Sequence, residues 1–142
     1  MNLYLDTSSL FKLYVEEEGS EDIAKMSRAA DAISISRVGY AELRGSLARA
    51  QRARRLTAAA YRDAVELFNG KWSTYAVREV TEPLVRLAGD LAAKHFLRGF
   101  DAIHLASAVT IQQELGEPIT FSAADDRLME AAEAEGLATA GS

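Results

Sequence analysis

Cysteine is absent from this 142-residue sequence, and proline and glycine are scarce, with two and nine residues. Without cysteine, neither disulfide bonds nor thiolate metal sites can form. So few prolines and glycines leave little material for a flexible linker. We therefore expect residues 1–142 to form a single domain, a size at which folding buries roughly two-thirds of the unfolded surface.

Long hydrophobic runs are missing as well. No stretch approaches the roughly 20 apolar residues that a membrane-spanning helix needs. Residues 1–6 have neither the basic start nor the apolar stretch of a secretory signal. Together with the lack of cysteine, this pattern predicts a cytoplasmic protein that has no membrane partner.

Positive charge is in short supply. The 16 lysines and arginines are outnumbered by 21 acidic residues, which gives a net charge of -5. A general nucleic-acid binder is usually basic, because lysine and arginine make its phosphate contacts. Seven arginines nevertheless fall between residues 37 and 62, where Glu42 is the only acid. This basic strip is a candidate anion-binding surface on an acidic protein.

Short apolar segments alternate with helical patterns along the chain. Strands are expected at residues 3–5, 32–36, 75–80 and 118–122, with a short final one at 137–139. Helices are expected between them, at residues 10–15, 20–26, 38–54, 57–72, 84–95, 101–109 and 125–134, with Ser8 and Ser9 as caps of the first. This alternation predicts an α/β fold of three layers, α/β/α, around a central parallel sheet.

Four acids occupy special places in this pattern. Asp6 directly follows the first strand, and Asp125 lies just past the fourth. Glu42 lies in the first turns of the helix after the second strand, and Asp101 begins a helix. Because sites in open α/β sheets form at the carboxyl ends of strands, we expect all four to project toward one edge. Taken singly, each acid has an ordinary alternative as a helix cap or an exposed helix residue.

Clustered carboxylates repel one another and resist burial, so a positive partner must compensate them. The residues adjacent to Asp6 and Asp101 include no lysine or arginine. A hard divalent cation fits better, because Mg²⁺ prefers oxygen ligands and needs only one or two carboxylates besides water and substrate phosphate. Such an ion activates water and neutralises charge on a scissile phosphate. The acids therefore predict metal-dependent hydrolysis of phosphodiester bonds.

The segments that carry these acids resemble the four acidic motifs of PIN domains. They lie at residues 5–10, 40–43, 100–106 and 120–125, and the resemblance runs from residue 3 to about residue 135. The third motif, around Asp101, is the most specific. More narrowly, the sequence resembles VapC-type toxins of prokaryotic toxin–antitoxin pairs. The resemblance implies a PIN-like fold, Mg²⁺- or Mn²⁺-dependent endoribonuclease activity on RNA, a cognate antitoxin and a homodimer.

The resemblance also implies a role for each acid. Asp6 and Asp101 match the main metal ligands, Glu42 completes the site, and Asp125 holds the metal directly or through water. One ion or two could bind. The hydroxyl groups beside the acids belong to Ser8 and Ser122.

Two positions leave alternatives open. In the fourth motif Asp125 precedes Leu128 by three residues, the spacing that this motif usually shows, but the adjacent Asp126 is the alternative. His104 shares a helix face with Asp101, three residues earlier, so it could orient a ligand, bind metal or simply pack between helices. In the basic strip, we expect contacts with RNA phosphates at Arg52, Arg54 and Arg55. A solvated helix face or a surface for an acidic antitoxin segment is the alternative.

Other functions remain as alternatives or are excluded. A haloacid-dehalogenase phosphatase needs a second aspartate where Ser8 stands, and a receiver domain needs a late lysine, but none follows Lys94. No glycine-rich phosphate loop is present. A structure-specific DNA nuclease and a catalytically silent PIN-like binding module stay open, because fold alone does not fix function.

Overall fold

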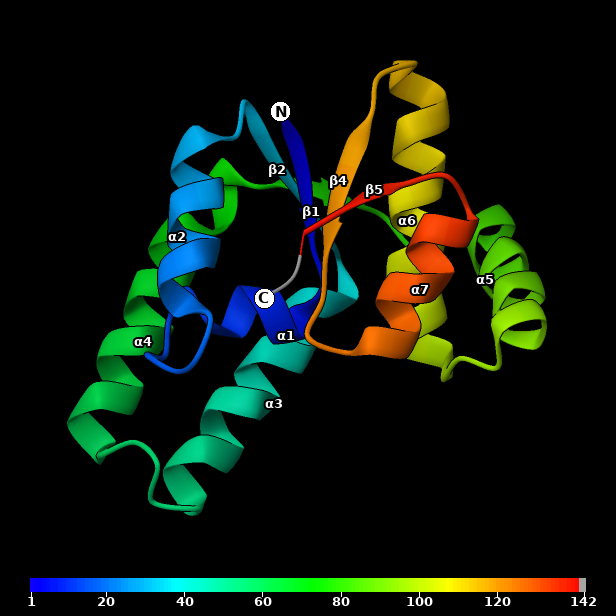
Figure 1. The fold of residues 1–142 in the computed structure, drawn as a ribbon. Coiled ribbons are helices and arrows are strands. Elements are labelled where there is room, and N and C mark those ends of the chain that lie inside the picture. Colours follow the sequence, from blue (N-terminus) through cyan, green and yellow to red (C-terminus); the bar gives the residue numbers. More distant parts are fainter. Residues whose placement is uncertain (141–142) are drawn as a thin grey trace.

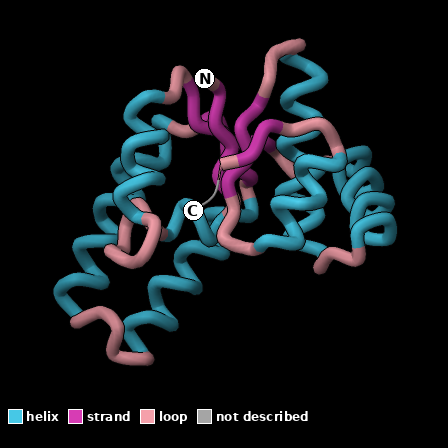
Figure 2. Tube along the Cα trace, in the orientation of Figure 1, coloured by secondary structure: helices cyan, strands magenta, loops and turns pink. Residues whose placement is uncertain are grey.

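The computed structural model describes residues 1–140. Its elements are β1 (Asn2–Leu5), α1 (Thr7–Phe11), α2 (Ser20–Ala29), β2 (Ala32–Ser36), α3 (Val38–Arg52), α4 (Ala58–Lys71), the 3₁₀ turn η1 (Trp72–Thr74), β3 (Ala76–Arg78), α5 (Glu82–His95), α6 (Gly99–Leu115), β4 (Ile119–Ser122), α7 (Asp126–Ala134) and β5 (Ala138–Thr139). Figure 1 shows their arrangement, and Figure 2 shows the loops that join them. Within the described part of the chain, no helix is both long and apolar enough to cross a membrane.

The strands form one parallel sheet in the order β3-β2-β1-β4-β5. The chain moves outward from β1 to β3 and then returns to the other side of β1 for β4 and β5. Helices α1 to α4 therefore cover one face of the sheet, and α5 to α7 cover the other (Figure 1). The predicted three-layer α/β/α fold is confirmed. Its topological switch point lies between β1 and β4, where sheets of this kind bind ligands.

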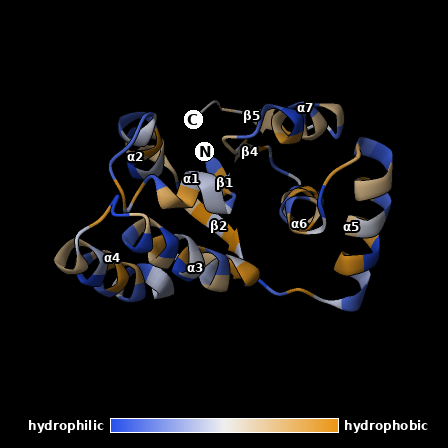
Figure 3. Cartoon of the chain, turned by 90° about the horizontal axis from the view of Figure 1, so that it is seen from below, coloured by the Kyte–Doolittle hydropathy of each residue, from blue (hydrophilic) through white to orange (hydrophobic). Residues whose placement is uncertain are grey.

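Strand β1 separates two hydrophobic cores by its alternating side chains. Leu3 and Leu5 are fully buried in the core that α1, α3 and α4 complete. Tyr4 is fully buried on the opposite face, where it stacks on Phe121 with ring centroids 5.6 Å apart. Burying a leucine side chain stabilises the fold by roughly 2 kcal/mol. In Figure 3, α6 lies between the sheet and α5, which explains why it is buried along most of its length.

The start of α1 differs from the sequence-based expectation. Asp6 caps this helix, because its carboxylate accepts a hydrogen bond from the Ser9 backbone N–H. The prediction that Ser8 and Ser9 act as caps is therefore wrong, since both lie within the helix. Thr57 caps α4, because its hydroxyl accepts a hydrogen bond from the Ala60 N–H.

Three boundaries also differ. Helix α1 ends at Phe11, and the following turns bury Val15, whose carbonyl accepts from the Ser20 hydroxyl. Helix α3 ends at Arg52 because Arg54 adopts a left-handed conformation with φ of 62°. Helix α6 begins at Gly99, so Asp101 lies in its first turn instead of opening it.

Candidate active site

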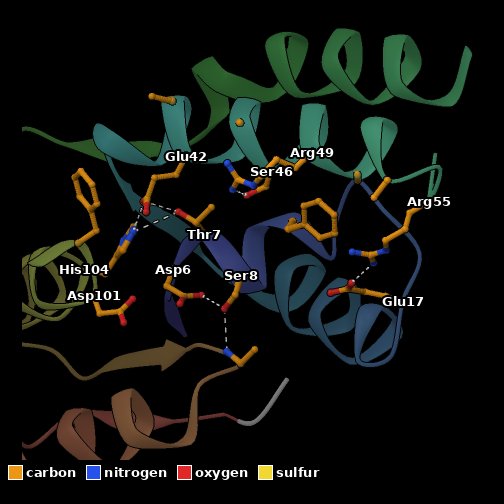
Figure 4. A pocket seen from close by; sticks show the side chains of 17 residues that line it. Asp6, Thr7, Ser8, Glu17, Glu42, Ser46, Arg49, Arg55, Asp101 and His104 are labelled. Atoms are coloured by element: carbon orange, nitrogen blue, oxygen red, sulfur yellow. Dashed lines mark hydrogen bonds and ion pairs between the residues drawn. The ribbon is translucent and has the colours of Figure 1, made fainter. Parts of the chain in front are cut away.

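A pocket of about 770 Å³ opens at the carboxyl edge of the sheet, beside the switch point. Four acids line it, as Figure 4 shows: Glu17, which pairs with Arg55, and the three predicted acids Asp6, Glu42 and Asp101. Asp6 directly follows β1, Glu42 comes from the second turn of α3, and Asp101 comes from the first turn of α6. The fold thus collects carboxylates from three separate segments of the chain.

Asp6 is buried, with 5% of its surface exposed. Its Oδ1 accepts hydrogen bonds from the Ser9 N–H at 2.9 Å and from the Ser8 hydroxyl at 2.7 Å. The Ser8 hydroxyl in turn accepts from the Ala124 N–H, which ties α1 to the segment after β4. Burial raises the pKa of Asp6 more than these bonds and the nearby His104 lower it, and the charge of Asp101 raises it further. Both bonds go to one oxygen, so the structure leaves Oδ2 available for a ligand.

Glu42 is held by two donors on one oxygen. Its Oε1 accepts from the Thr7 hydroxyl and from Nε2 of His104, each at 2.7 Å. Burial raises the pKa of Glu42, but the hydrogen bonds and charge of His104 outweigh that effect, so the pKa is lowered overall. Glu42 is therefore a fixed, ionised carboxylate whose Oε2 carries no bond from the described residues.

His104 is 2% exposed and connects this carboxylate to the core. Its Nδ1 lies 2.8 Å from the hydroxyl of Tyr4. Because a carboxylate can only accept, Nε2 of His104 must carry the proton, and in a neutral ring Nδ1 then accepts from Tyr4. Glu42 thus fixes the proton of His104 on Nε2, and Tyr4 completes the hydrogen-bonded chain at Nδ1.

Asp101 and Asp125 face each other across the edge of the pocket. Asp125 caps α7 by accepting from the Leu128 N–H at 2.9 Å, and it shares a second, smaller pocket with Asp101. Burial raises the pKa of Asp101, and the charges of Asp125 and Glu42 raise it further. Asp126 also lines the smaller pocket, in the first turn of α7.

Nearby positive charge compensates these acids only in part, because Arg98 and His104 lower the pKa of Asp101 less than burial and the other acids raise it. Over residues 1–140, no ion pair involves Asp6, Asp101 or Asp125. No group of three or more acidic or histidine side chains in this part of the chain stands at metal-ligand spacing. The donor set is still a fit for a hard cation, because Mg²⁺ takes one or two carboxylates and completes its shell with water and substrate oxygens.

The two predicted serines are placed differently. Ser8 contacts Asp6 directly, whereas the buried Ser122 bonds to the Ser9 hydroxyl at 2.9 Å and contacts no acid by hydrogen bond. Ser122 instead offers its carbonyl to the Asp6 N–H at 3.1 Å. Ser122 therefore supports the backbone at Asp6, and Ser8 supports its carboxylate.

Of the basic strip, Arg49 and Arg55 line the pocket, whereas Arg52 and Arg54 lie outside its lining. Sequence reasoning did not single out Thr7 or Arg49. Thr7 had a weak signal, because it adjoins Asp6, but its bond to Glu42 depends on how α3 packs against α1. The sequence signal for Arg49 was stronger, because Arg49 lies seven residues after Glu42 and therefore on the same helix face.

Comparison with known proteins adds the family. The PIN domain family matches residues 3–134. Ribonuclease VapC49 from Mycobacterium tuberculosis is 36% identical over 139 residues, which cover 97% of this chain and 94% of that protein. Ribonuclease VapC47 from the same species is 32% identical over 143 residues, with 97% and 95% covered.

A solved structure agrees with the fold. VapBC2 from Rickettsia felis, bound to a DNA fragment from its promoter, superposes with a TM-score of 0.67 at 11% identity, covering 100% of this chain and 99% of that one. Family, relatives and fold thus agree over nearly the whole chain: the chain belongs to the PIN-domain family, among relatives that include VapC ribonucleases.

Proposed function

We propose that this protein is a divalent-metal-dependent endoribonuclease and the toxin of a toxin–antitoxin pair. The observation that carries the proposal is the pocket in which Asp6, Glu42 and Asp101 meet, none of them ion-paired with a lysine or arginine of residues 1–140. The relatives named ribonucleases, at 36% and 32% identity over nearly the whole chain, support RNA as the substrate. The site lies at the switch point, where this fold class binds ligands.

Asp6 and Asp101 would hold Mg²⁺ or Mn²⁺, with Asp125 contributing directly or through water. When bound, the ion lowers the pKa of a coordinated water and neutralises charge on the scissile phosphate. Glu42 keeps Oε1 on Thr7 and His104, and its Oε2 orients a water molecule for attack on phosphorus. Ser8 fixes the Asp6 carboxylate, and Ser122 fixes the backbone beside it.

RNA, an antitoxin and a second copy of the chain are the proposed partners, in the cytoplasm. Arg52, Arg54 and Arg55 extend the RNA surface beyond the acids, at the end of α3 and the loop after it. The antitoxin blocks the pocket, as the resemblance to VapC-type toxins implies. Light scattering of the purified protein measures whether it is a homodimer.

Cleavage of total cellular RNA tests the proposal. The protein is incubated with Mg²⁺, with Mn²⁺ or with EDTA, and compared with Asp6→Asn and Asp101→Asn. Each variant keeps the shape of the side chain but loses one carboxylate oxygen, so cleavage should fall by about a hundredfold or more. Asp90→Asn is the matched control, because Asp90 is an exposed acid of α5 outside the pocket.

The outcomes separate the alternatives. Discrete RNA fragments that require metal and disappear in both site variants support the endoribonuclease. Cleavage of a branched DNA in place of RNA indicates a DNA nuclease. RNA binding without cleavage of either polymer, in a folded protein, indicates a binding module.

A further inference from the structure

The pocket extends well beyond its acids. It follows one face of α3, from Glu42 through Gly45 and Ser46 to Arg49, and then reaches Ala53. These positions recur every three or four residues, so they form a continuous stripe along the helix. The pocket is therefore a groove with the three predicted acids at one end, Arg49 along its wall and the Arg55–Glu17 ion pair toward the other end.

The side chain of Arg49 extends along this stripe in the direction of the acids. In Figure 4 its guanidinium group lies beside Ser46, on the side of the helix that faces Thr7 and Glu42. Nη2 donates to the Ser46 hydroxyl at 3.1 Å. A Cβ atom placed on Gly45 would approach Nη1 of Arg49 to 3.2 Å. The missing side chain at Gly45 thus leaves room for the guanidinium group against the helix.

The charge of Arg49 is not neutralised by an acid. Within residues 1–140 its side chain takes part in no ion pair, although four carboxylates line the same groove. Arg55, the other arginine of the groove, pairs with Glu17 at 3.0 Å and lies over the ring of Phe11. Arg49 is therefore the groove arginine whose charge is available to an anion.

We propose that Arg49 binds an RNA backbone phosphate next to the scissile one. This rests on the proposed function, because the acid end of the groove must hold the scissile phosphate. A guanidinium group matches the geometry of two phosphate oxygens and keeps its charge at any relevant pH. A single RNA strand that lies along α3 then passes from the acids to Arg49.

Binding without cleavage tests the assignment separately from catalysis. A fluorescent single-stranded oligoribonucleotide is titrated with Asp101→Asn protein in EDTA, and anisotropy is followed at several salt concentrations. Adding Arg49→Ala should weaken binding roughly tenfold and flatten the salt dependence, with a slope smaller by about 0.7. Arg28→Ala is the matched control, because Arg28 is an exposed arginine in the last turn of α2, at the opposite edge of the sheet (Figure 1).

Gly45→Ala provides a second variant that keeps the charge. The added methyl group displaces a flexible side chain and improves helix propensity, so the fold is preserved. If it acts by moving Arg49, RNA binding falls, and the double variant with Arg49→Ala binds no worse than Arg49→Ala alone. Such non-additivity is the signature of two residues that act through one interaction.

The results decide between two readings. A specific loss with Arg49→Ala, no loss with Arg28→Ala and a non-additive Gly45→Ala support the phosphate site, even if RNA cleavage fails. Unchanged binding with Arg49→Ala, equal losses with Arg28→Ala, strictly additive losses, or no RNA binding by the parent protein overturn it. If the parent protein cleaves RNA and Arg49→Ala leaves RNA binding unchanged, the proposed function stands and only the role of Arg49 is removed.

Discussion

Asp6 is both a helix cap and a proposed metal ligand, so the two interpretations of this residue are compatible. An aspartate before a helix is an ordinary cap, and Asp6 does cap α1 through Oδ1. The same burial that fixes the cap also places its carboxylate in the pocket beside Asp101. The cap therefore positions the proposed ligand. His104 is similar, because its place in the helix packing is also what lets it hold Glu42.

Tyr4→Phe tests whether the buried chain from Tyr4 through His104 positions Glu42. The ring keeps its stacking on Phe121, but Nδ1 of His104 loses its hydrogen-bond partner, so the imidazole ring is held less firmly against Glu42. We expect a stability loss of about 1–3 kcal/mol, the cost of an unsatisfied buried polar group. We also expect weaker Mn²⁺ binding by calorimetry and a several-fold lower kcat at unchanged KM for RNA.

Tyr75→Phe is the control for this variant. Tyr75 bonds to the hydroxyl of Tyr14 in the other core, away from the acids. It should lose stability by a similar amount and keep its Mn²⁺ affinity and kcat. Equal effects of both variants on kcat would mean that Tyr4 acts only on stability.

Asp101→Asn should stabilise the metal-free protein. Because folding raises the pKa of Asp101, the folded state favours the protonated carboxyl, and ionisation costs stability. This cost develops as the pH rises from the ordinary carboxyl value of 3.8 through the raised value of the folded state. Thermal unfolding in EDTA at neutral pH should give a higher Tm for Asp101→Asn than for the parent protein. Addition of Mn²⁺ should raise the Tm of the parent protein by more than it raises the Tm of the variant. A lower Tm for the variant would contradict this electrostatic picture.

At the scale of elements, local sequence signals predicted the order and type of helices and strands well. Thr57 and Thr81 cap the starts of α4 and α5. Such starts can be recognised in a sequence, because a threonine cap and a following proline act within one turn of the helix. The early end of α1 at Phe11 and the early start of α6 at Gly99 could not be predicted from the sequence. Their ends depend on tertiary contacts, such as the bond between Ser20 and the carbonyl of Val15.

Two helix ends provide a matched prediction. The residues that follow α5 and α6, Phe96 and Gly116, cap these helices in the left-handed conformation, with φ of 57° and 66°. This conformation costs a residue with a side chain roughly 1–2 kcal/mol. Phe96 is 82% exposed, so Phe96→Gly should raise the free energy of unfolding by up to about 1 kcal/mol.

Gly116→Ala should do the opposite. Nothing lies within 4 Å of its added Cβ, so only the backbone conformation opposes it, and we expect a loss of about 1 kcal/mol. Urea unfolding measures both variants. Destabilisation by Phe96→Gly would show that the exposed ring makes a contact that compensates its strained backbone.

At the scale of the whole molecule, the strand order explains why distant acids meet. The sequence indicated acids after separate strands, but only the order β3-β2-β1-β4-β5 places β1 beside β4 and so brings Asp6 near Asp101 and Asp125. The groove along α3 could not be predicted in the same way. Its walls combine α1, α3 and α6, and their packing depends on both cores.

Anomalous diffraction from crystals soaked in Mn²⁺ tests the central claim that these carboxylates form a divalent-metal site. The account predicts an anomalous peak between Asp6 and Asp101, about 2.0–2.2 Å from at least one oxygen of each, as expected for hard octahedral cations. The peak should disappear in Asp101→Asn crystals. The absence of an anomalous peak at the acids after a soak in saturating Mn²⁺ would contradict the account. A peak that remains in the Asp101→Asn crystals would contradict it as well.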